Sequence, residues 1–185
     1  MSDADREKWD AKWAARGGPG APSASVVALE RFMPTKGRAL DVAGGVGRHA
    51  LWLARRGLDV TLVDVSPVAL AIARSRAGDV PLTTVALDLD CEPLPEGPWD
   101  LVICAYFFDR RVYPALRGLV APGGALVIAH PTIVNLERHE HPQAAFLLQP
   151  GELVGFAAGL EILHSSEGWS ADGHFEALLV ARKPL

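Results

Sequence analysis

The amino-acid sequence predicts an α/β protein built on a doubly wound, mostly parallel β-sheet. Residues 39–56 have the pattern of a strand, a glycine-rich turn and a helix in direct succession. From there to residue 129, short apolar runs alternate with helical patterns, as in right-handed β-α-β units. Two last strands, expected over 160–165 and 175–182, predict a terminal hairpin that adds an antiparallel strand to one end of the sheet.

Length and composition narrow the class of protein. The 185 residues suffice for one domain with a sizeable core and are few for two. A hydrophobic content of 49% is typical of globular chains, and a formal charge of -4 without a basic stripe argues against a nucleic-acid partner. We therefore expect a single domain over 1–185, with 1–35 as an N-terminal helical cap. The oligomeric state is not indicated.

The same sequence predicts a cytoplasmic setting. The N-terminal residues are charged and lack the apolar core of a signal peptide. No apolar run approaches the ~20 residues that a membrane span needs, so no membrane association is expected. Cys91 and Cys104 form neither a metal-binding spacing nor a disulfide framework, which fits a reducing compartment.

Local patterns predict the individual elements. Trp9 and Trp13 lie four residues apart within a helix expected over 5–15, and Ser25 is a possible N-cap of a second helix over 25–32. Gly57 and Gly78 close the helices that follow the first two strands. Prolines and a glycine in 90–99 predict a loop, and 131–149 is expected to be irregular. The strands are expected over 39–43, 59–65, 82–89, 101–107 and 125–129, and the helices between them over 48–56, 67–76, 111–120 and 150–158.

Three aspartates fall at the ends of three successive predicted strands: Asp41, Asp64 and Asp88. In an open α/β sheet, ligands bind outside the carboxyl ends of the strands, where these aspartates are expected. Asp64 follows Gly45 by 19 residues and is placed to accept hydrogen bonds from both hydroxyls of a ribose, which would offset the cost of burying its carboxylate. Each aspartate alone is equally explained as a turn or helix cap, whereas three together favour a binding site.

The glycine loop by itself leaves two ligand classes open. Gly45, Gly47 and Ala50 also fit the dinucleotide-binding fingerprint, so an NAD-binding oxidoreductase is one alternative. Asp41, just ahead of the loop, would repel a pyrophosphate and attract an ammonium group. The chain also lacks room for a second, substrate-binding domain. Both points favour a nucleoside that carries an amine in place of phosphates.

The motifs resemble those of the class I S-adenosylmethionine-dependent methyltransferases over essentially the whole chain. Residues 40–48, Leu-Asp-Val-Ala-Gly-Gly-Val-Gly-Arg, resemble the first motif, with Ala43 in place of its first glycine. Further matching segments are 61–64 and 86–89 for the second and third motifs and 99–106 and 119–126 for the fourth and fifth strands. The resemblance implies the Rossmann-like, seven-stranded methyltransferase fold, S-adenosylmethionine as cofactor, S-adenosylhomocysteine as product and no metal.

The resemblance also assigns roles to residues. It implies that Asp64 binds the ribose, Asp88 the adenine amino group and Leu89 the ring edge. Arg48 either pairs with the methionine carboxylate or is a solvated residue of the first helical turn. The expected cofactor contacts are Asp41, Ala43, Gly44, Gly45, Gly47, Arg48, Asp64, Val65, Asp88, Leu89, Cys104, Trp9 and Trp13.

Two segments are similar to a narrower group. Trp9-Asp-Ala-Lys-Trp13 resembles the N-terminal Trp-Asp-x-x-Tyr element of the tellurite-resistance and thiopurine-type small-molecule methyltransferases. Residues 146–153 are similar to the closing region of the same group. The implied acceptor is a small molecule. The two tryptophans either close over the site as an aromatic lid or bury against the sheet edge.

The reaction that the resemblance implies is an in-line transfer from a sulfonium methyl group to a nucleophile, so the protein chiefly positions and desolvates. A thiolate, tellurite or selenite needs no base, whereas an amine, phenol or hydroxyl can require one. Candidates for that role are Tyr106, Asp109, His130, His139 and His141. His130 is the strongest because it ends the fifth strand, although for each of these residues taken alone, rim packing or loop solvation is the more frequent explanation. A cofactor-binding protein without catalysis is the other alternative.

Overall fold

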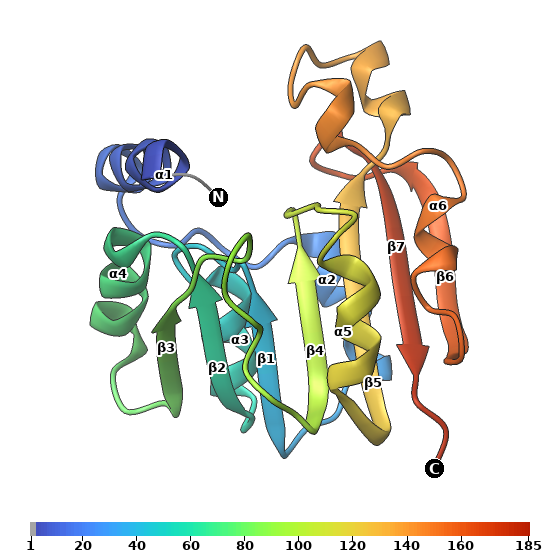
Figure 1. Cartoon of the computed structure of the whole chain (residues 1–185), viewed down its shortest axis with the longest axis horizontal. Coiled ribbons are helices and arrows are strands. Elements are labelled where there is room, and N and C mark those ends of the chain that lie inside the picture. Colours follow the sequence, from blue (N-terminus) through green and yellow to red (C-terminus); the bar gives the residue numbers. More distant parts are fainter. Residues whose placement is uncertain (1–2) are drawn as a thin grey trace. The chain divides into compact units, whose positions relative to one another are not determined.

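A computed structural model describes residues 3–185 of the chain (Figure 1). Seven strands form one sheet in the order β3-β2-β1-β4-β5-β7-β6. The pairs β1–β2, β2–β3 and β4–β5 are parallel, whereas β7 is antiparallel to both β5 and β6. This confirms the predicted mostly parallel sheet with an antiparallel hairpin at its end.

Contacts between residues divide the chain into two compact units, which are described separately. The first contains the chain up to Ser23 together with Thr35–Glu96, and the second contains Ala24–Pro34 together with Gly97–Leu185. The chain therefore passes between the units at three points. The assignment of one domain with a cap over 1–35 stays a prediction.

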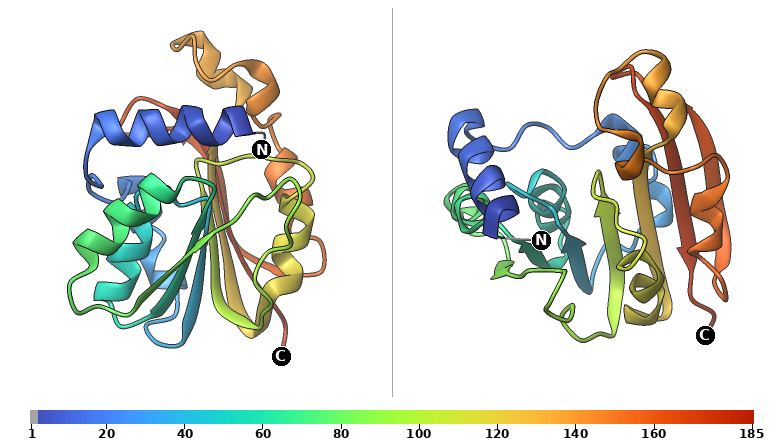
Figure 2. Two further views of the ribbon diagram at one scale, coloured as in Figure 1. Left: turned by 60° about the vertical axis from the view of Figure 1, so that its left-hand side comes forward. Right: turned by 45° about the horizontal axis from the view of Figure 1, so that its top comes forward.

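The first unit is a three-stranded parallel sheet with helices packed on it. Its elements are α1 (Asp3–Arg16), β1 (Arg38–Val42), α3 (Arg48–Arg55), β2 (Asp59–Asp64), α4 (Pro67–Ala77) and β3 (Leu82–Ala86). The apolar side chains of β1 and β2 are buried. Ser66 caps α4, because its side chain accepts a hydrogen bond from the Ala69 amide at 3.0 Å. Helix α1 lies beside α4 at the end of this unit where β1 and β2 finish (Figures 1 and 2).

The third strand is shorter than predicted. β3 ends at Ala86, which is paired with Asp64, the last residue of β2. Beyond that point the strand has no neighbour with which to continue its hydrogen-bond ladder. Asp88 and Leu89 therefore lie in the loop after β3, and Asp88 does not end a strand as predicted. The predicted loop before β4 is confirmed.

The second unit contains the remaining four strands. Its elements are α2 (Ala24–Val27), η1 (Glu30–Phe32), β4 (Trp99–Ala105), α5 (Tyr113–Leu119), β5 (Val120–Pro131), η2 (Ile133–Glu137), η3 (Ala144–Phe146), α6 (Glu152–Gly155), β6 (Glu161–Trp169) and β7 (Phe175–Arg182). The predicted helix over 25–32 is divided into α2 and η1, and α6 ends earlier than predicted. β6 continues beyond residue 165 to Trp169, because it pairs with β7 along that length.

The start of β5 is irregular. Trp99 pairs with Val120, but Leu101 pairs with Ala125. The predicted Pro-Gly-Gly turn at 122–124 is thus contained within β5 as a bulge. No helix within residues 3–185 combines the length and apolar character that crossing a bilayer requires.

Candidate functional site

The loop that joins β1 to α3 is a tight turn of bare backbone. Gly45 and Gly47 have positive φ angles of 57° and 78°, and Ala43, which is not a glycine, has a φ of 53°. A Cβ atom at Gly44 would lie 2.5 Å from the Leu62 side chain and 2.6 Å from the Asp41 carboxyl carbon. The loop therefore has no room for a side chain at Gly44, and its backbone closes directly around Asp41.

Asp41 is a buried carboxylate without a partner. Its side chain is 1% exposed, and neither of its oxygens has a hydrogen-bond partner among residues 3–185. Burial raises the pKa of Asp41 to about 7; the nearby Ala50 backbone amide, which does not reach hydrogen-bonding geometry, acts against this rise, Asp64 adds to it, and Arg48 opposes it. Buried polar groups in native proteins are normally satisfied, so an orphaned acid beside a bare loop points to a ligand with a cationic donor.

Asp64 joins the end of β2 to the glycine loop. Its Oδ2 accepts a hydrogen bond from the Gly45 amide at 2.8 Å, and its Oδ1 accepts one from the Ser66 amide at 2.9 Å. Burial raises the pKa of this carboxyl, and the two amides act in the opposite direction. Each carboxylate oxygen keeps a second lone pair for a hydroxyl donor. Because Ser66 caps α4, the interpretation of Asp64 as the helix cap is not supported.

Four further residues that are expected to contact the cofactor lie outside the glycine loop: Val65, Asp88, Leu89 and Cys104. Val65 is buried directly after Asp64, next to the loop. Asp88 and Leu89 are half-buried after β3, where the Asp88 Oδ1 accepts the Asp90 amide at 2.9 Å in a local turn. Cys104 belongs to β4 in the second unit, where its thiol is buried and lies 3.8 Å from the Phe107 carbonyl oxygen. A role for each in cofactor binding stays a prediction.

Arg48, the first residue of α3, lines a pocket of about 540 Å³ on the first unit. Residues 19–22, the α3 side chains Trp52 and Arg55, and Arg76 at the end of α4 also line it. Its expected contact with the methionine carboxylate stays a prediction.

Helix α1 places an aromatic side chain on the glycine loop. A Cβ atom at Gly45 would lie 2.9 Å from the Trp13 ring, so the indole packs directly on the loop backbone. Trp9 stacks on Trp13 with ring centroids 5.9 Å apart. Asp10 holds the helix in place: its Oδ1 accepts hydrogen bonds from the Ser66 hydroxyl and, at 3.4 Å, from the Val68 amide. Trp13 therefore lies against the glycine loop, and closure of the tryptophan pair over a bound cofactor stays a prediction.

His130, at the end of β5, is a neutral imidazole with one free nitrogen. The side chain is 5% exposed, and its Nε2 lies 2.8 Å from the Phe146 carbonyl oxygen, which requires Nε2 to carry the proton. Nδ1 is then a lone pair with no partner among residues 3–185. Burial lowers the pKa of His130 to about 4, and the contact with Phe146 opposes this. The ring also packs on Phe108 at 5.4 Å between centroids.

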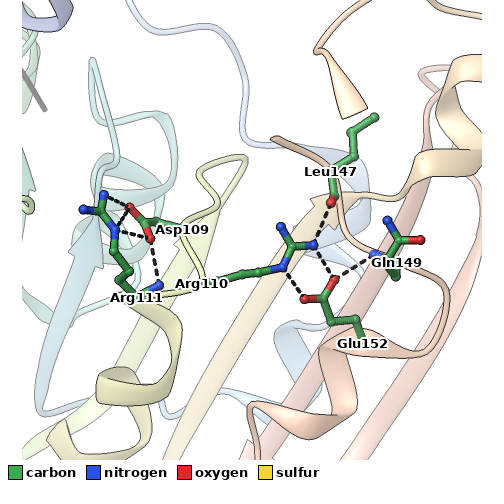
Figure 3. A network of polar contacts seen from close by, with 6 residues as sticks. All are labelled: Asp109, Arg110, Arg111, Leu147, Gln149 and Glu152. Atoms are coloured by element: carbon green, nitrogen blue, oxygen red, sulfur yellow. Dashed lines mark hydrogen bonds and ion pairs between the residues drawn. The ribbon is translucent and has the colours of Figure 1, made fainter. Parts of the chain in front are cut away.

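Asp109 is engaged by its own neighbours (Figure 3). Its carboxylate accepts hydrogen bonds from the backbone amide of Arg111 at 2.7 Å and from the guanidinium of the same residue. The hydrogen bond from the Arg111 side chain is the main cause that lowers the pKa of Asp109. Alongside it, Arg110 forms a two-pronged ion pair with Glu152 of α6 (Figure 3). A carboxylate held in this way is a poor proton acceptor.

The remaining histidine candidates, His139 and His141, lie after β5, between η2 and η3. His139 contacts the Gly173 carbonyl oxygen at 2.8 Å and stacks on His174 at 4.6 Å between centroids. His141 is exposed. Within the described part of the chain, no group of three or more His, Cys, Asp or Glu residues is arranged to hold a metal ion.

Tyr106 and Glu176 form a contact of which the sequence indicated only one member. The Tyr106 hydroxyl donates to the Glu176 Oε1 at 3.0 Å, and Glu176 is 2% exposed. Glu176 was not among the expected site residues, because it sits inside an otherwise apolar strand. A charged residue in such a run was the available signal.

Known proteins resemble this arrangement. The family described as "Methyltransferase domain" matches residues 39–124. A ubiquinone/menaquinone biosynthesis C-methyltransferase, UbiE, of Methylobacterium nodulans is 32% identical over 131 residues, covering 63% of this chain and 52% of that protein. The chain spans about half the length of the curated relatives that it matches.

Solved structures share the fold. Magnesium protoporphyrin IX methyltransferase from Synechocystis, determined with bound S-adenosylhomocysteine, superimposes with a TM-score of 0.71 at 18% identity, covering 97% of this chain and 98% of that one. TehB from Haemophilus influenzae gives a TM-score of 0.69 at 21% identity, covering 85% and 60%. Residues 39–124, which contain the glycine loop, Asp41 and Asp64, thus match a methyltransferase domain, and the whole chain shares its fold with solved methyltransferase structures.

Proposed function

We propose that this chain transfers the methyl group of S-adenosylmethionine to a small-molecule acceptor. The observation that carries the proposal is the buried, unpartnered carboxylate of Asp41 within a loop of bare backbone, linked through Gly45 to Asp64. An amine-bearing nucleoside supplies what these residues lack: an ammonium group for the first acid and hydroxyl donors for the second. A dinucleotide would instead bring its phosphates to an acid.

The residues of the chain divide the work between cofactor and acceptor. When bound, S-adenosylmethionine supplies an activated methyl group and a neutral thioether leaving group. Asp64, Val65 and the glycine loop would hold the nucleoside, and Trp13 would cover it. For an amine or hydroxyl acceptor, the Nδ1 of His130 would offer a hydrogen-bond acceptor to the nucleophile, while its Nε2–H stays bonded to the Phe146 carbonyl; with a pKa of about 4, this imidazole is a weak base. A thiolate acceptor would not need this contact.

The proposal also includes the class of methyl acceptor and the cellular compartment of the protein. The fit to small-molecule methyltransferases supports a low-molecular-weight acceptor, and the chain is expected to act in the cytoplasm without a nucleic-acid partner.

Replacement of Asp64 tests the cofactor assignment. Asp64→Ala should weaken S-adenosylhomocysteine binding at least a hundredfold, because both ribose hydroxyls lose their acceptor. The matched control is Asp59→Ala, which removes an exposed acid at the start of the same strand. Calorimetric titration with S-adenosylhomocysteine and with NAD measures both variants, and thermal unfolding shows that each folds. Near-normal affinity of Asp64→Ala would refute the ribose assignment, and a preference for NAD would support the oxidoreductase.

Catalysis is separated from simple binding by turnover. A panel of thiols, phenols, amines and metalloid oxyanions is incubated with the protein and methyl-labelled cofactor. Labelled product from any member supports the transferase, whereas tight binding of S-adenosylhomocysteine with no labelled product would favour a non-catalytic binding protein.

A further inference from the structure

Glu176 is a second buried acid with an unused oxygen, and it lies in the other unit. It stands one residue into β7, and its side chain is 2% exposed. The Oε1 atom accepts the Tyr106 hydroxyl, but the Oε2 atom is buried without a hydrogen-bond partner within residues 3–185. Leaving such an oxygen unpaired is costly, so its presence calls for a functional explanation.

The residue that holds Glu176 is itself in a rare conformation. Tyr106 directly follows β4 and has a φ of 64°, which is unusual for a bulky side chain. Its amide donates to the Ala129 carbonyl at 2.8 Å, and its hydroxyl reaches Glu176. Backbone strain of this kind persists at sites where the surrounding contacts enforce it, and it is commonly found at functional sites.

Strand register separates Glu176 from His130. In the β5–β7 ladder, Pro131 pairs with Glu176 and His130 pairs with Ala177. Because successive side chains of a strand alternate between faces, Glu176 and His130 project from opposite faces of the sheet. His130 packs on Phe108, on the side where α5 lies. Glu176 therefore cannot serve as the orienting partner of His130, and its free oxygen needs a different occupant.

The end of the sheet at which Glu176 lies is informative. Tyr106 and His130 follow or end the parallel strands β4 and β5, and Glu176 is beside the last pair of β5. Ligands of open α/β sheets bind outside the carboxyl ends of the parallel strands. Glu176 is thus placed at the ligand-binding end of its unit.

We infer that the Oε2 atom of Glu176 anchors an N–H or O–H donor on the methyl acceptor, at a group separate from the atom that is methylated. The inference rests on the proposed methyl transfer. A carboxylate oxygen only accepts hydrogen bonds, so an acceptor molecule without such a donor leaves it unpaired. An ammonium group pairs most strongly, because the hydrogen bond is then charge-assisted at both ends. Tyr106 acts as a positioning residue that fixes the carboxylate.

A matched series of thiols isolates this contact. Cysteamine, mercaptoethanol and ethanethiol offer a thiolate nucleophile with an ammonium, a hydroxyl or no donor, and kcat/KM is calculated per thiolate because their thiol pKa values differ. Methyl transfer by the full-length chain should give kcat/KM values that fall in this order, with cysteamine roughly tenfold or more above ethanethiol. Glu176→Gln replaces one of the two carboxylate oxygens with an amide N–H donor and removes the negative charge. The kcat/KM of cysteamine should then fall towards that of ethanethiol through a higher KM, with kcat largely kept.

The control variants keep the test specific. Glu161→Gln removes an exposed acid of the adjacent strand β6 and should retain the preference. Tyr106→Phe should reduce the preference partially, because Glu176 stays in place without its hydrogen-bond donor. All variants should bind S-adenosylhomocysteine as the parent does. If Glu176→Gln does not unfold cooperatively, Tyr106→Phe carries the comparison.

The outcomes distinguish this inference from the proposed function. Equal kcat/KM for the three thiols, no methylation of any of them, or an unchanged preference in Glu176→Gln would each overturn the role of Glu176. Normal binding of S-adenosylhomocysteine in those cases leaves the cofactor site intact. A parent chain that fails to bind S-adenosylhomocysteine would instead overturn the proposed function.

Discussion

Asp41 shows at the scale of one residue how a binding site stores free energy. The folded chain buries this carboxylate without a partner, and burial raises its pKa to about 7. At a pH above that value the charged form destabilises the empty protein, because the unfolded chain solvates the same charge freely. A cationic ligand group at Asp41 would relieve this destabilisation, so binding of that group would be more favourable by part of the same free energy.

Asp41→Asn should therefore stabilise the empty protein and weaken its cofactor. The folded-state pKa is raised, so the free energy of unfolding of the wild type falls as pH rises from about 4 to about 7, by up to about 1.4 kcal/mol for each step of one in pH. The variant should gain melting temperature over the parent at pH 8 and little at pH 4, while its affinity for S-adenosylhomocysteine drops. Scanning calorimetry at both pH values and titration calorimetry measure the two effects. An equal melting-temperature change at both pH values would contradict the burial argument.

Among the elements, α1 contacts both the start of α4 and the glycine loop of the candidate cofactor site. Asp10 binds the start of α4, and Trp13 rests on Gly45. The sequence predicted this helix from its tryptophan spacing, but it left open where the tryptophans lie. Helix periodicity defines which face is apolar and says nothing of the surface that this face meets.

Asp10→Ala should loosen α1 and weaken the cofactor. The substitution removes the acceptor of the Ser66 hydroxyl and the Val68 amide, which together contribute about 1–2 kcal/mol. Hydrogen exchange in α1 should quicken, and affinity for S-adenosylhomocysteine should fall severalfold. The exposed Glu7 on the same helix provides the control variant Glu7→Ala. If S-adenosylhomocysteine leaves exchange in α1 of the parent unchanged, the helix does not act as a lid.

At the scale of the whole molecule, a few buried groups determine how stability depends on pH. Burial lowers the pKa of His49 to about 3, where its Nε2 accepts the Ser23 amide at 3.3 Å, and lowers that of His130 to about 4. Between those values and about 6.5, the unfolded chain binds protons that the folded chain does not. Each histidine therefore contributes stability that is present above pH 6.5 and is lost as the pH falls, opposite in sign to Asp41.

His49→Gln should flatten this dependence. Glutamine keeps a hydrogen-bond acceptor for Ser23 and does not titrate. The folded and unfolded states of the variant therefore no longer differ in the number of protons bound at this position. The variant should have a lower free energy of unfolding than the parent at pH 7.5. This difference should be about 2 kcal/mol smaller at pH 5. Urea unfolding at the two pH values provides the measurement. Parallel losses in parent and variant would show that His49 titrates normally.

Prediction from sequence succeeded where local chemistry decides the outcome. Alternating strands and helices, the turn glycines and the acids at the ends of β1 and β2 all follow from neighbours along the chain. The end of β3 was wrong because it depends on where β2 stops, which is a property of pairing. Glu176 was missed because β7 is buried on both faces, so alternation does not reveal that an acid points inward. Register between distant strands is what the sequence alone did not provide.

The interleaving of the two units along the chain bears on how this protein tolerates rearrangement. Residues 24–34 belong with β4–β7, yet both flanking segments belong with β1–β3. A fragment that stops at residue 96 would retain the glycine loop, Asp41 and Asp64, but would carry a stretch deprived of the strands on which it packs. Duplication or shuffling of the nucleoside-binding half as a module would thus require a new connection between residues 23 and 35.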